Sequence, residues 1–486
     1  MELPYYSYHL ALCILLALLY HAALRAAATA ATRRPRPKLP PGPWQLPIIG
    51  SLHHLLRGLP HHIMRDLSLR HGPLMLLRVC EREAIVVSSA EAAREIYKGN
   101  EATFSARLSS PGIDELSRHG QGIVFAPYGD HWRLLRRILM MELLSARRVK
   151  AFRRIREEEA ARLVSSLQAT SDGRLVNIGE RLEEFVTDSV DLSLIFGLRD
   201  LFPSSWLVRL VPRGGGGKAE RHRQEVFSVM GSILKSHEER RAARDGDAEH
   251  EQDMVQVLLR IQKDATTRVS LTDGVIRALL IDVFGAALDT TATTLQWAMA
   301  ELMANPRVMR RVQSEADCAL AGQATVQEAA LKSMQYLRAV IKETLRLHPP
   351  AVLFPRMCVG DCKIQGYDVP RGMIVLTNTW AISRDPKYWD EPDKFMPERF
   401  KGEGVADLRG MDFEFTPFGV GRRICPGIDF AYANLEIALA SLLYHFNWEL
   451  PLGVEPGEVD MTEEFGVTAR RKVNLFVRPI IRVPLR

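Results

Sequence analysis

The segment that most constrains this chain is PFGVGRRICPG, Pro417–Gly427, which leads into a long apolar stretch beginning at Ile428. Its glycines allow the backbone to turn tightly beneath a flat group and let the next segment start close against it. The apolar stretch predicts a helix, so Cys425 stands at a helix N-terminus. The helix dipole and the neighbouring Arg422 and Arg423 favour the thiolate over the thiol. The loop therefore predicts a thiolate ligand for a metal such as iron.

The other five cysteines of this 486-residue chain form no framework. Cys358 and Cys362 are four residues apart, but no second cysteine or histidine pair follows to complete a zinc site. Scattered single thiols are typical of a reducing compartment. A lone cysteine is usually structural, so the chemistry assigned to Cys425 depends on the whole loop around it.

The charge is basic, with a formal net charge of +6 and a pI near 9.0. Basic residues alternate with acidic ones, as in 153–159 (RRIREEE), and no nucleic-acid motif accompanies them, which argues against a nucleic-acid partner. Solvated helix faces are the simpler interpretation. A basic docking face for an acidic protein partner is the alternative.

Residues Leu3–Leu24 are strongly apolar and almost uncharged, and roughly 20 such residues span a bilayer as a helix. Basic residues follow between Arg25 and Lys38, whereas only Glu2 precedes, so the positive-inside rule places the rest in the cytosol. A cleaved secretory signal is the alternative, because small residues follow at 26–31. The n-region without positive charge and the long apolar stretch favour an uncleaved anchor.

Three regions are therefore expected. Residues 1–24 form a single-pass transmembrane anchor, and residues 25–43 form a basic, proline-rich hinge that ends in the stiff segment KLPPGP. No long Ser/Gly/Pro linker interrupts the remainder, which predicts one catalytic domain over residues 44–486.

The periodicity of the body is mainly helical. Apolar, β-branched residues on both sides of Glu81-Arg82-Glu83 predict a strand pair over 74–89, and 363–379 predicts a second strand-turn-strand unit. Helices are expected over 151–167, 225–242, 276–303, 308–320 and 333–347, with Asn305-Pro306 separating the third from the fourth. The fold class is therefore mainly α with a small β-sheet subdomain.

The loop also fits Phe-x-x-Gly-x-Arg-x-Cys-x-Gly, with all five fixed positions filled. It resembles the haem-binding loop of the cytochrome P-450 family, and from Pro40 onward the chain is similar to plant microsomal members. The resemblance implies haem b held between two buried helices. Cys425 would be its axial ligand, Phe418 would shield the sulfur, Arg423 would pair with a propionate, and Gly427 would complete the loop.

Further haem contacts follow from the same resemblance. Trp132 and Arg136 match the family's Trp-x-x-x-Arg helix and share one helical face, which implies that both reach a propionate. Arg356, after Phe354-Pro355, is another propionate candidate. His131 is a rival ligand, although a histidine in such a place is usually exposed.

Glu343 and Arg346 are three residues apart on an expected helix, so they can pair. With the downstream segment 395–400 they resemble the family's Glu-Arg-Arg network, which Arg399 would complete. A buried carboxylate shared by two guanidinium groups is satisfied, whereas an unpaired one is costly. The implied role is structural.

Asp289 and Thr290 lie within the long apolar helix expected over 276–303, where polar side chains are costly unless they have partners. The resemblance implies an oxygen-activation site in which both relay protons. The simpler interpretation, a threonine bonded back to the carbonyl four residues earlier, is compatible with that role. Ala287 stands where the family usually has glycine.

A second departure follows Gly197. The family usually carries another substrate-covering helix before a segment like 200–205 (DLFPSS), but here only Leu198 and Arg199 intervene. This departure predicts a shortened roof over the substrate.

The resemblance implies a monooxygenase that uses O2 and NADPH electrons delivered by a membrane-bound flavoprotein reductase. No glycine-rich dinucleotide fold is present for direct NADPH binding. Candidates for the docking face are Arg133, Arg137 and Arg422. Family recognition segments fall near 109–120, 280–290, 352–354 and 465–468. Their apolar character suits a small terpenoid, fatty or aromatic substrate in a pocket that includes Ala286, Val352, Phe354 and Val467.

Two alternatives remain. A haem-thiolate hydroperoxide isomerase or dehydratase would need no reductase, but such relatives typically lose the acid–alcohol pair that is intact here. A non-catalytic relative lacking the roof helix is the other. An uncleaved anchor with a cytosolic body predicts the endoplasmic reticulum membrane, and the family likeness predicts a role in secondary metabolism.

Overall fold

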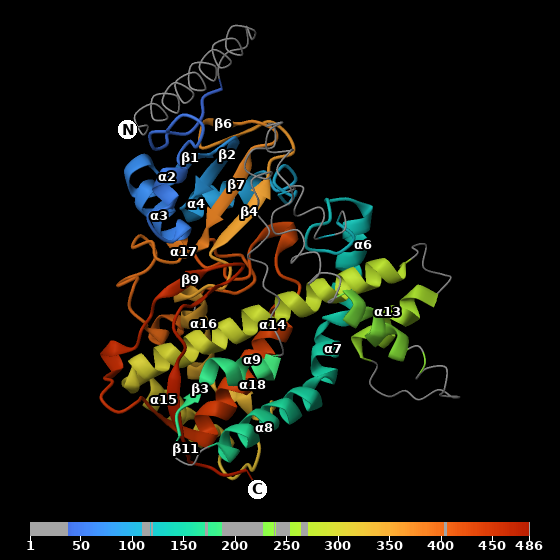
Figure 1. The fold of residues 1–486 in the computed structure, drawn as a ribbon, viewed down its shortest axis with the longest axis vertical. Coiled ribbons are helices and arrows are strands. Elements are labelled where there is room, and N and C mark those ends of the chain that lie inside the picture. Colours follow the sequence, from blue (N-terminus) through green and yellow to red (C-terminus); the bar gives the residue numbers. More distant parts are fainter. Residues whose placement is uncertain are drawn as a thin grey trace, which may run out of the picture.

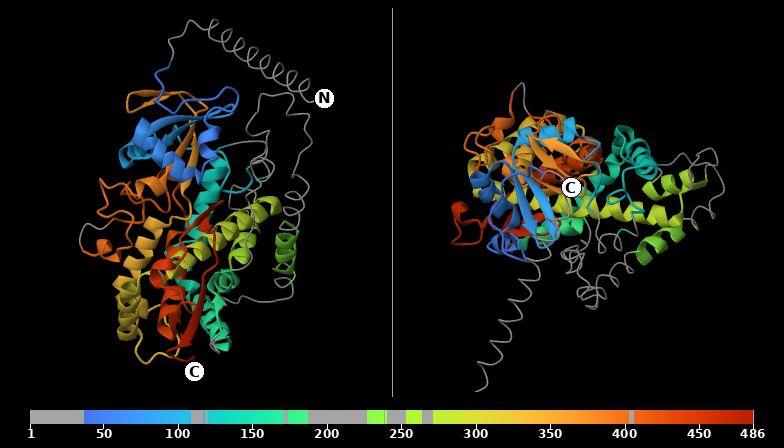
Figure 2. Two further views of the ribbon diagram at one scale, coloured as in Figure 1. Left: turned by 60° about the vertical axis from the view of Figure 1, so that its left-hand side comes forward. Right: turned by 90° about the horizontal axis from the view of Figure 1, so that it is seen from above.

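The computed structural model describes residues 37–108, 117, 120–170, 174–186, 227–237, 239, 253–263, 271–402 and 406–485. A four-stranded sheet lies at one end of the molecule and a larger helical body at the other (Figure 1). Figure 2 shows the same division from a second side. The predicted fold class, mainly helical with small sheets, is confirmed.

The main sheet has the strand order β1-β2-β7-β4. Its strands are β1 (Leu74–Val79), β2 (Arg82–Val87), β7 (Ile374–Asn378) and β4 (Leu353–Met357). β2 and β7 run parallel, whereas the two outer pairings are antiparallel. Segments nearly 300 residues apart in the sequence thus share one sheet, and β4 brings Arg356 to its edge.

The helical body is built round α14 (Asp273–Ala304), which crosses it from end to end (Figure 1). The Thr272 hydroxyl caps this helix by accepting from the Val275 N–H at 3.3 Å. It ends before Pro306, where α15 (Pro306–Leu320) begins. Its other large neighbours are α16 (Gln335–Leu347), α18 (Ile428–His445) and α9 (Ile178–Val186).

Apolar side chains of these helices form the largest core. Leu295, Val312, Leu337 and Leu439 are all fully buried, and each such side chain contributes about 1.5–3 kcal/mol when removed from water. α8 (Arg153–Ala169) covers this core from outside. Its alternating charges form ion pairs four residues apart, such as Arg153 with Glu157 at 2.8 Å.

Shorter elements complete the described part. The helices are α2 (Leu52–Leu55), α3 (Pro60–His71), α4 (Ala90–Arg94), α6 (Asp130–Ile138), α7 (Ala146–Ala151), α13 (Met254–Lys263) and α17 (Thr379–Ile382). The strands are β3 (Val176–Asn177), β5 (Cys362–Ile364), β6 (Tyr367–Val369), β8 (Phe446–Glu449), β9 (Glu463–Phe465), β10 (Ala469–Arg471) and β11 (Phe476–Ile481).

Most predicted elements are confirmed, with two corrections. The β1–β2 turn is at Cys80-Glu81, one residue earlier than predicted, because Cys80 adopts a positive φ of 55° and Arg82 already pairs with Val79. The segment 363–379 contains parts of three strands rather than two. Of the helix predicted over 225–242, residues 227–237 and 239 are described, and these are helical.

The end of the predicted hinge is packed on the domain. Leu76 N–H donates to the Pro41 carbonyl at 2.8 Å, and a Cβ on Gly42 would collide with the Leu76 carbonyl oxygen at 2.0 Å. No helix in the described ranges is both long and apolar enough to cross a membrane. The predicted anchor, residues 1–24, and the departure after Gly197 lie outside the described residues.

Candidate functional site

The Cys425 loop has the tight geometry that its glycines predict. Gly419 and Gly421 have positive φ values of 74° and 69°, a region that favours glycine. The Cys425 N–H donates to the Phe418 carbonyl at 2.9 Å, which closes the turn. The Gly427 N–H, at the start of α18, donates to the Cys425 sulfur at 3.3 Å. The sulfur is therefore held by the backbone, and the residue as a whole is half-buried.

Burial raises the pKa of Cys425, while a backbone N–H and the positive charge of Arg136 act in the opposite direction. From the sequence, Arg422 and Arg423 were expected to stabilise the Cys425 thiolate by their positive charge. This prediction is wrong, because Arg136 has that role. Arg422 forms an ion pair with Glu101 at 3.0 Å, and Arg423 donates to backbone carbonyls. Coordination to iron would hold the sulfur as the thiolate, because metal binding deprotonates a thiol outright.

Four arginines gather beside this loop. They are Arg107, Arg136, Arg356 and Arg423. The charge of Asp282 acts on Arg107, but no described carboxylate forms an ion pair with any of the four. Burial and the charges of Arg356 and Arg423 lower the pKa of Arg107 well below its ordinary value, and burial together with Arg356 and Arg136 lowers that of Arg423 to about 10. Within the described part of the chain, the buried Nε of Arg107 has no hydrogen-bond partner.

Such a cluster is costly unless an anion occupies its centre. Haem brings two propionate carboxylates and takes a thiolate ligand, so the cluster and Cys425 fit this group. Arg136, Arg356 and Arg423 were predicted as propionate partners. The sequence reasoning missed Arg107, because no local spacing marks it and only the tertiary fold brings it to the others.

Trp132, on α6 with Arg136, is 5% exposed. The Arg423 guanidinium lies 5.0 Å from the centre of its ring, so the indole packs under the cation cluster. His131, the rival ligand, is exposed and lies with Nε2 3.0 Å from the Gln121 carbonyl, outside this cluster.

The middle of α14 keeps accessible surface although both flanks are buried. Residues 281–290 are all at least partly exposed, Phe284 reaching 37%, whereas 291–295 are buried. Ten consecutive residues in the middle of a central apolar helix therefore keep accessible surface.

Asp289 and Thr290 lie in that exposed stretch. The Thr290 hydroxyl donates to the Ala286 carbonyl at 2.7 Å, as the simpler interpretation proposed. Asp289 accepts a hydrogen bond from the Thr468 hydroxyl at 2.7 Å. The sequence reasoning placed Thr468 in a recognition segment but missed this contact, which joins residues 179 apart in the chain. Asp289 is thus oriented by the turn between β9 and β10.

The four predicted pocket residues differ in exposure. Ala286 is exposed on α14, and Val467, in the β9–β10 turn, is 53% exposed. Phe354 is half-buried on β4, and its ring lies 3.8 Å from where a Cβ on Gly419 would stand. Val352 is only 3% exposed and packs in a small cluster with Trp380, Ala381 and Ala469. Phe354 is therefore next to the loop, whereas Val352 is part of a core.

The structure brings Glu343, Arg346 and Arg399 together. Arg346 donates to both carboxylate oxygens of Glu343 at 2.7 and 2.8 Å, and Arg399 donates to one of them at 3.0 Å. Glu343 and Arg346 are fully buried. Arg346 also donates to the carbonyls of Ser383 and Pro392, so the network ties α16 to the chain that follows β7.

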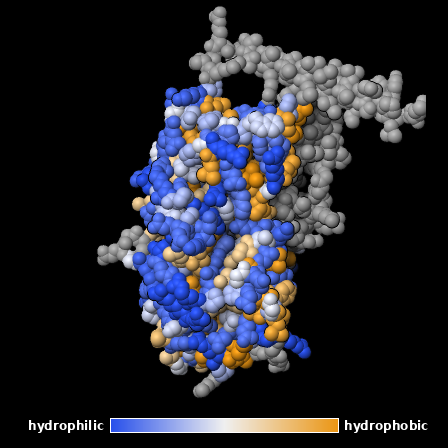
Figure 3. All heavy atoms as spheres, turned by 90° about the vertical axis from the view of Figure 1, so that its left-hand side faces the viewer, coloured by the Kyte–Doolittle hydropathy of each residue, from blue (hydrophilic) through white to orange (hydrophobic). Residues whose placement is uncertain are grey.

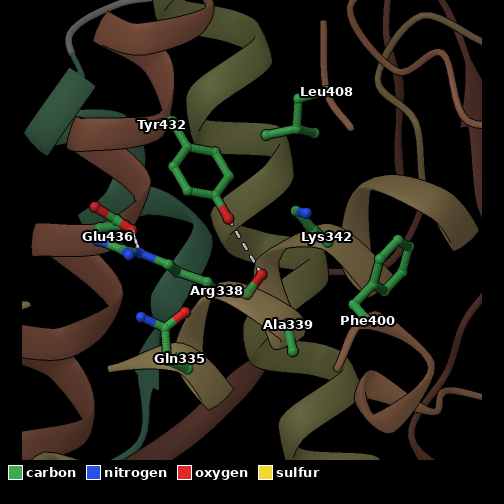
Figure 4. Close-up of a pocket in the computed structure, with 8 residues that line it drawn as sticks. All are labelled: Gln335, Arg338, Ala339, Lys342, Phe400, Leu408, Tyr432 and Glu436. Atoms are coloured by element: carbon green, nitrogen blue, oxygen red, sulfur yellow. Dashed lines mark hydrogen bonds and ion pairs between the residues drawn. The ribbon is translucent and has the colours of Figure 1, made fainter. Parts of the chain in front are cut away.

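A surface hollow of about 310 Å³ lies elsewhere, on the outer side of α16 and α18 (Figure 4). Arg338 pairs there with Glu436 at 2.5 Å, and the Tyr432 hydroxyl donates to the Arg338 carbonyl at 3.2 Å. The hollow contains none of the predicted site residues. Its lining is Gln335, Arg338, Ala339, Lys342, Phe400, Leu408, Tyr432 and Glu436.

Two of the three docking candidates contact the same aromatic ring. Arg133 and Arg422 both lie over the Tyr128 ring, at 5.5 and 5.2 Å. Each also has an acidic partner, Asp130 for Arg133, whereas Arg137 is exposed and forms no ion pair with a described carboxylate. Elsewhere the surface is mixed, and the face in Figure 3 is mainly hydrophilic with smaller apolar groups.

The Cytochrome P450 family model matches residues 40–202 and 193–475. The chain belongs to the cytochrome P450 family. It is therefore a P450-type monooxygenase whose cofactor is haem, with NADPH electrons delivered through a reductase, as is standard for the family. The two matches overlap at 193–202, the same place where the sequence departs after Gly197.

Plant relatives are similar over nearly their whole length. Desmethyl-deoxy-podophyllotoxin synthase of Sinopodophyllum hexandrum is 43% identical, covering 91% of this chain and 92% of its own. Ent-isokaurene C2/C3-hydroxylase of Oryza sativa subsp. japonica is also 43% identical, over 93% and 94%. A zebra fish cytochrome P450 structure with abiraterone has a TM-score of 0.71 at 25% identity, covering 87% of this chain and 99% of that chain.

Proposed function

We propose that this P450 hydroxylates or otherwise oxidises a terpenoid-like or aromatic lipophilic metabolite in plant-type secondary metabolism. The observation that carries this proposal is the partly exposed middle of α14, where an acid and an alcohol, Asp289 and Thr290, lie next to each other. The names of relatives support the substrate class. They include a zealexin A1 synthase and a dolabradiene monooxygenase from Zea mays, each 41% identical.

Each group of residues has one task in this proposal. Bound haem supplies the binding and activation of O2. Cys425 would be the sulfur ligand, and the four arginines would neutralise the propionates. Thr290 and Asp289 move protons from solvent, with Thr468 holding the Asp289 carboxylate in place. Apolar side chains such as Ala286, Phe354 and Val467 exclude water from the substrate.

We further propose the location and partners. Residues 1–24 anchor the chain in the endoplasmic reticulum membrane, residues 25–43 connect the anchor to the domain, and the catalytic domain from residue 44 lies in the cytosol. The packing of Pro41 on β1 supports a connection whose last residues are fixed to the domain. A flavoprotein reductase would dock near Arg133, Arg137 and Arg422, on α6 and in the Cys425 loop.

The test is the reduced, carbon-monoxide-bound spectrum of the full-length protein in membranes, followed by turnover. A strongly red-shifted Soret band that is lost in Cys425→Ala is expected. NADPH and reductase should then be required to oxidise a member of a panel of sesquiterpene and diterpene hydrocarbons. Turnover of a fatty-acid hydroperoxide without NADPH would favour the isomerase or dehydratase instead. Well-expressed protein with no haem band would favour the non-catalytic relative.

A further inference from the structure

A second cluster of metal-binding side chains lies away from Cys425. The ligand atoms of His61 and His62 on α3 and of Glu463 on β9 all lie within 4.8 Å of one another. Figure 1 shows α3, α17 and β9 on the same side of the molecule. We propose that His61, His62 and Glu463 bind a divalent transition-metal ion of the zinc class.

The distances are close to those of a zinc site. Zinc bonds of 2.0–2.1 Å in a tetrahedron place neighbouring ligand atoms about 3.3 Å apart. The Nε2 atoms of His61 and His62 lie 2.7 and 3.3 Å from the same Glu463 oxygen. Small side-chain movements therefore suffice to make room for an ion between the three atoms.

A fourth protein ligand is within reach. His348 Nδ1 lies 4.0 Å from the other Glu463 oxygen, and this buried nitrogen has no hydrogen-bond partner among the described residues. Its Nε2 contacts Glu301 at 2.7 Å, and its ring stacks on Trp297 at 3.9 Å. A carboxylate on the far ring nitrogen is a common support for a metal-binding histidine.

The donor set also suits a metal of this class. Two imidazoles and one carboxylate are ligands that zinc takes in proteins. Arg384 is a nearby cation that would repel a metal ion. It forms an ion pair with Asp393 at 3.3 Å, which offsets part of its charge.

The site connects to the substrate side through one hairpin. Glu463 begins β9, which pairs with β10, and the turn between them carries Thr468, the donor to Asp289. An ion at Glu463 would fix the base of the hairpin to α3. The binding measurement itself does not depend on turnover, so it remains informative whatever the substrate is.

The test is Zn²⁺ binding to the haem-loaded, full-length protein, measured by equilibrium dialysis with elemental analysis. The His62→Ala variant removes a ligand whose side chain is 40% exposed, so the fold is retained. The control is His71→Ala, at the other end of the same helix. We expect one Zn²⁺ site whose affinity falls more than about tenfold in His62→Ala, since even loss of an outer partner of a ligand costs 10–100-fold. His71→Ala should bind like the wild type.

The Cys358–Cys362 pair is the main competitor, because its sulfur atoms lie 4.0 Å apart. Cys362→Ser and zinc K-edge absorption separate the two sites, since the proposed site has only nitrogen and oxygen ligands. Nitrogen and oxygen ligation that persists in Cys362→Ser supports the proposal. Equal affinity in wild type and His62→Ala, or sulfur ligation lost in Cys362→Ser, would overturn it.

Discussion

Replacement of Glu343 by glutamine tests the buried Glu-Arg-Arg network. The carboxylate accepts from Arg346 twice, from Arg399 and from the Met396 N–H, at 2.7–3.0 Å. An amide keeps the volume but removes the charge and offers one acceptor instead of two, which leaves the fully buried Arg346 without a counter-ion. Removing one partner of a buried ion pair costs about 3–5 kcal/mol.

That cost converts into a shift of the unfolding temperature. An unfolding entropy of about 2.1 cal/mol/K per residue gives roughly 1 kcal/mol/K for a chain of this length, so Glu343→Gln should lower the midpoint by about 3–5 °C. Calorimetry at one fixed scan rate measures this, because large proteins often unfold irreversibly. The control is Glu158→Gln, whose partner Arg154 is 74% exposed at 3.5 Å and whose ion pair contributes at most about 0.5 kcal/mol. Equal midpoints for the two variants would refute the assignment of a buried, charge-compensating role to Glu343.

Three further predictions concern the site. Thr468→Val removes the hydroxyl that donates a hydrogen bond to Asp289. Because a hydrogen bond to a charged group contributes about 1.5–3 kcal/mol, the product formed per NADPH consumed should fall about tenfold. The absorption band of the carbon-monoxide complex should be unchanged. Burial raises the pKa of Asp282 from 3.8 to about 6. The protonated carboxyl therefore stabilises the fold fully below about pH 4, and about 3 kcal/mol of this stability is lost as the pH rises through 6. Denaturant melts of Asp282→Asn at several pH values should lack this loss. Gly421→Ala places a Cβ on a backbone with φ 69°, 3.1 Å from the Glu101 carboxylate. This should lower the free energy of unfolding by about 1–3 kcal/mol and weaken haem retention. The control Gly457→Ala has open space around its Cβ and should change neither.

Local features of the site could be predicted from the sequence. Positive φ at the loop glycines and the helix start at Ile428 follow from residue type and apolar periodicity alone. The Glu343–Arg346 pair is equally local, since residues three apart on a helix share a face. These interactions depend on a few neighbouring residues, so the sequence contains the information directly.

Contacts between distant segments could not be derived in this way. Arg399 reaches Glu343 across 56 residues, and only the family resemblance suggested that contact. Arg107 and the Thr468–Asp289 bond have no local pattern at all. The electrostatic role given to Arg422 was wrong for the same reason, because its partner Glu101 is more than 300 residues away.

The four arginines beside Cys425 link folding to the cofactor. Burial, and after it their mutual repulsion, lowers the pKa values of Arg107 and Arg423. An anionic group that relieves this repulsion binds the folded state and has no comparable site in the unfolded chain, so its binding free energy adds to stability. The arginines come from four separate places, the segment before residue 109, α6, β4 and the Cys425 loop. We therefore expect haem binding to hold the sheet, α6 and the loop together, in addition to supplying the chemistry.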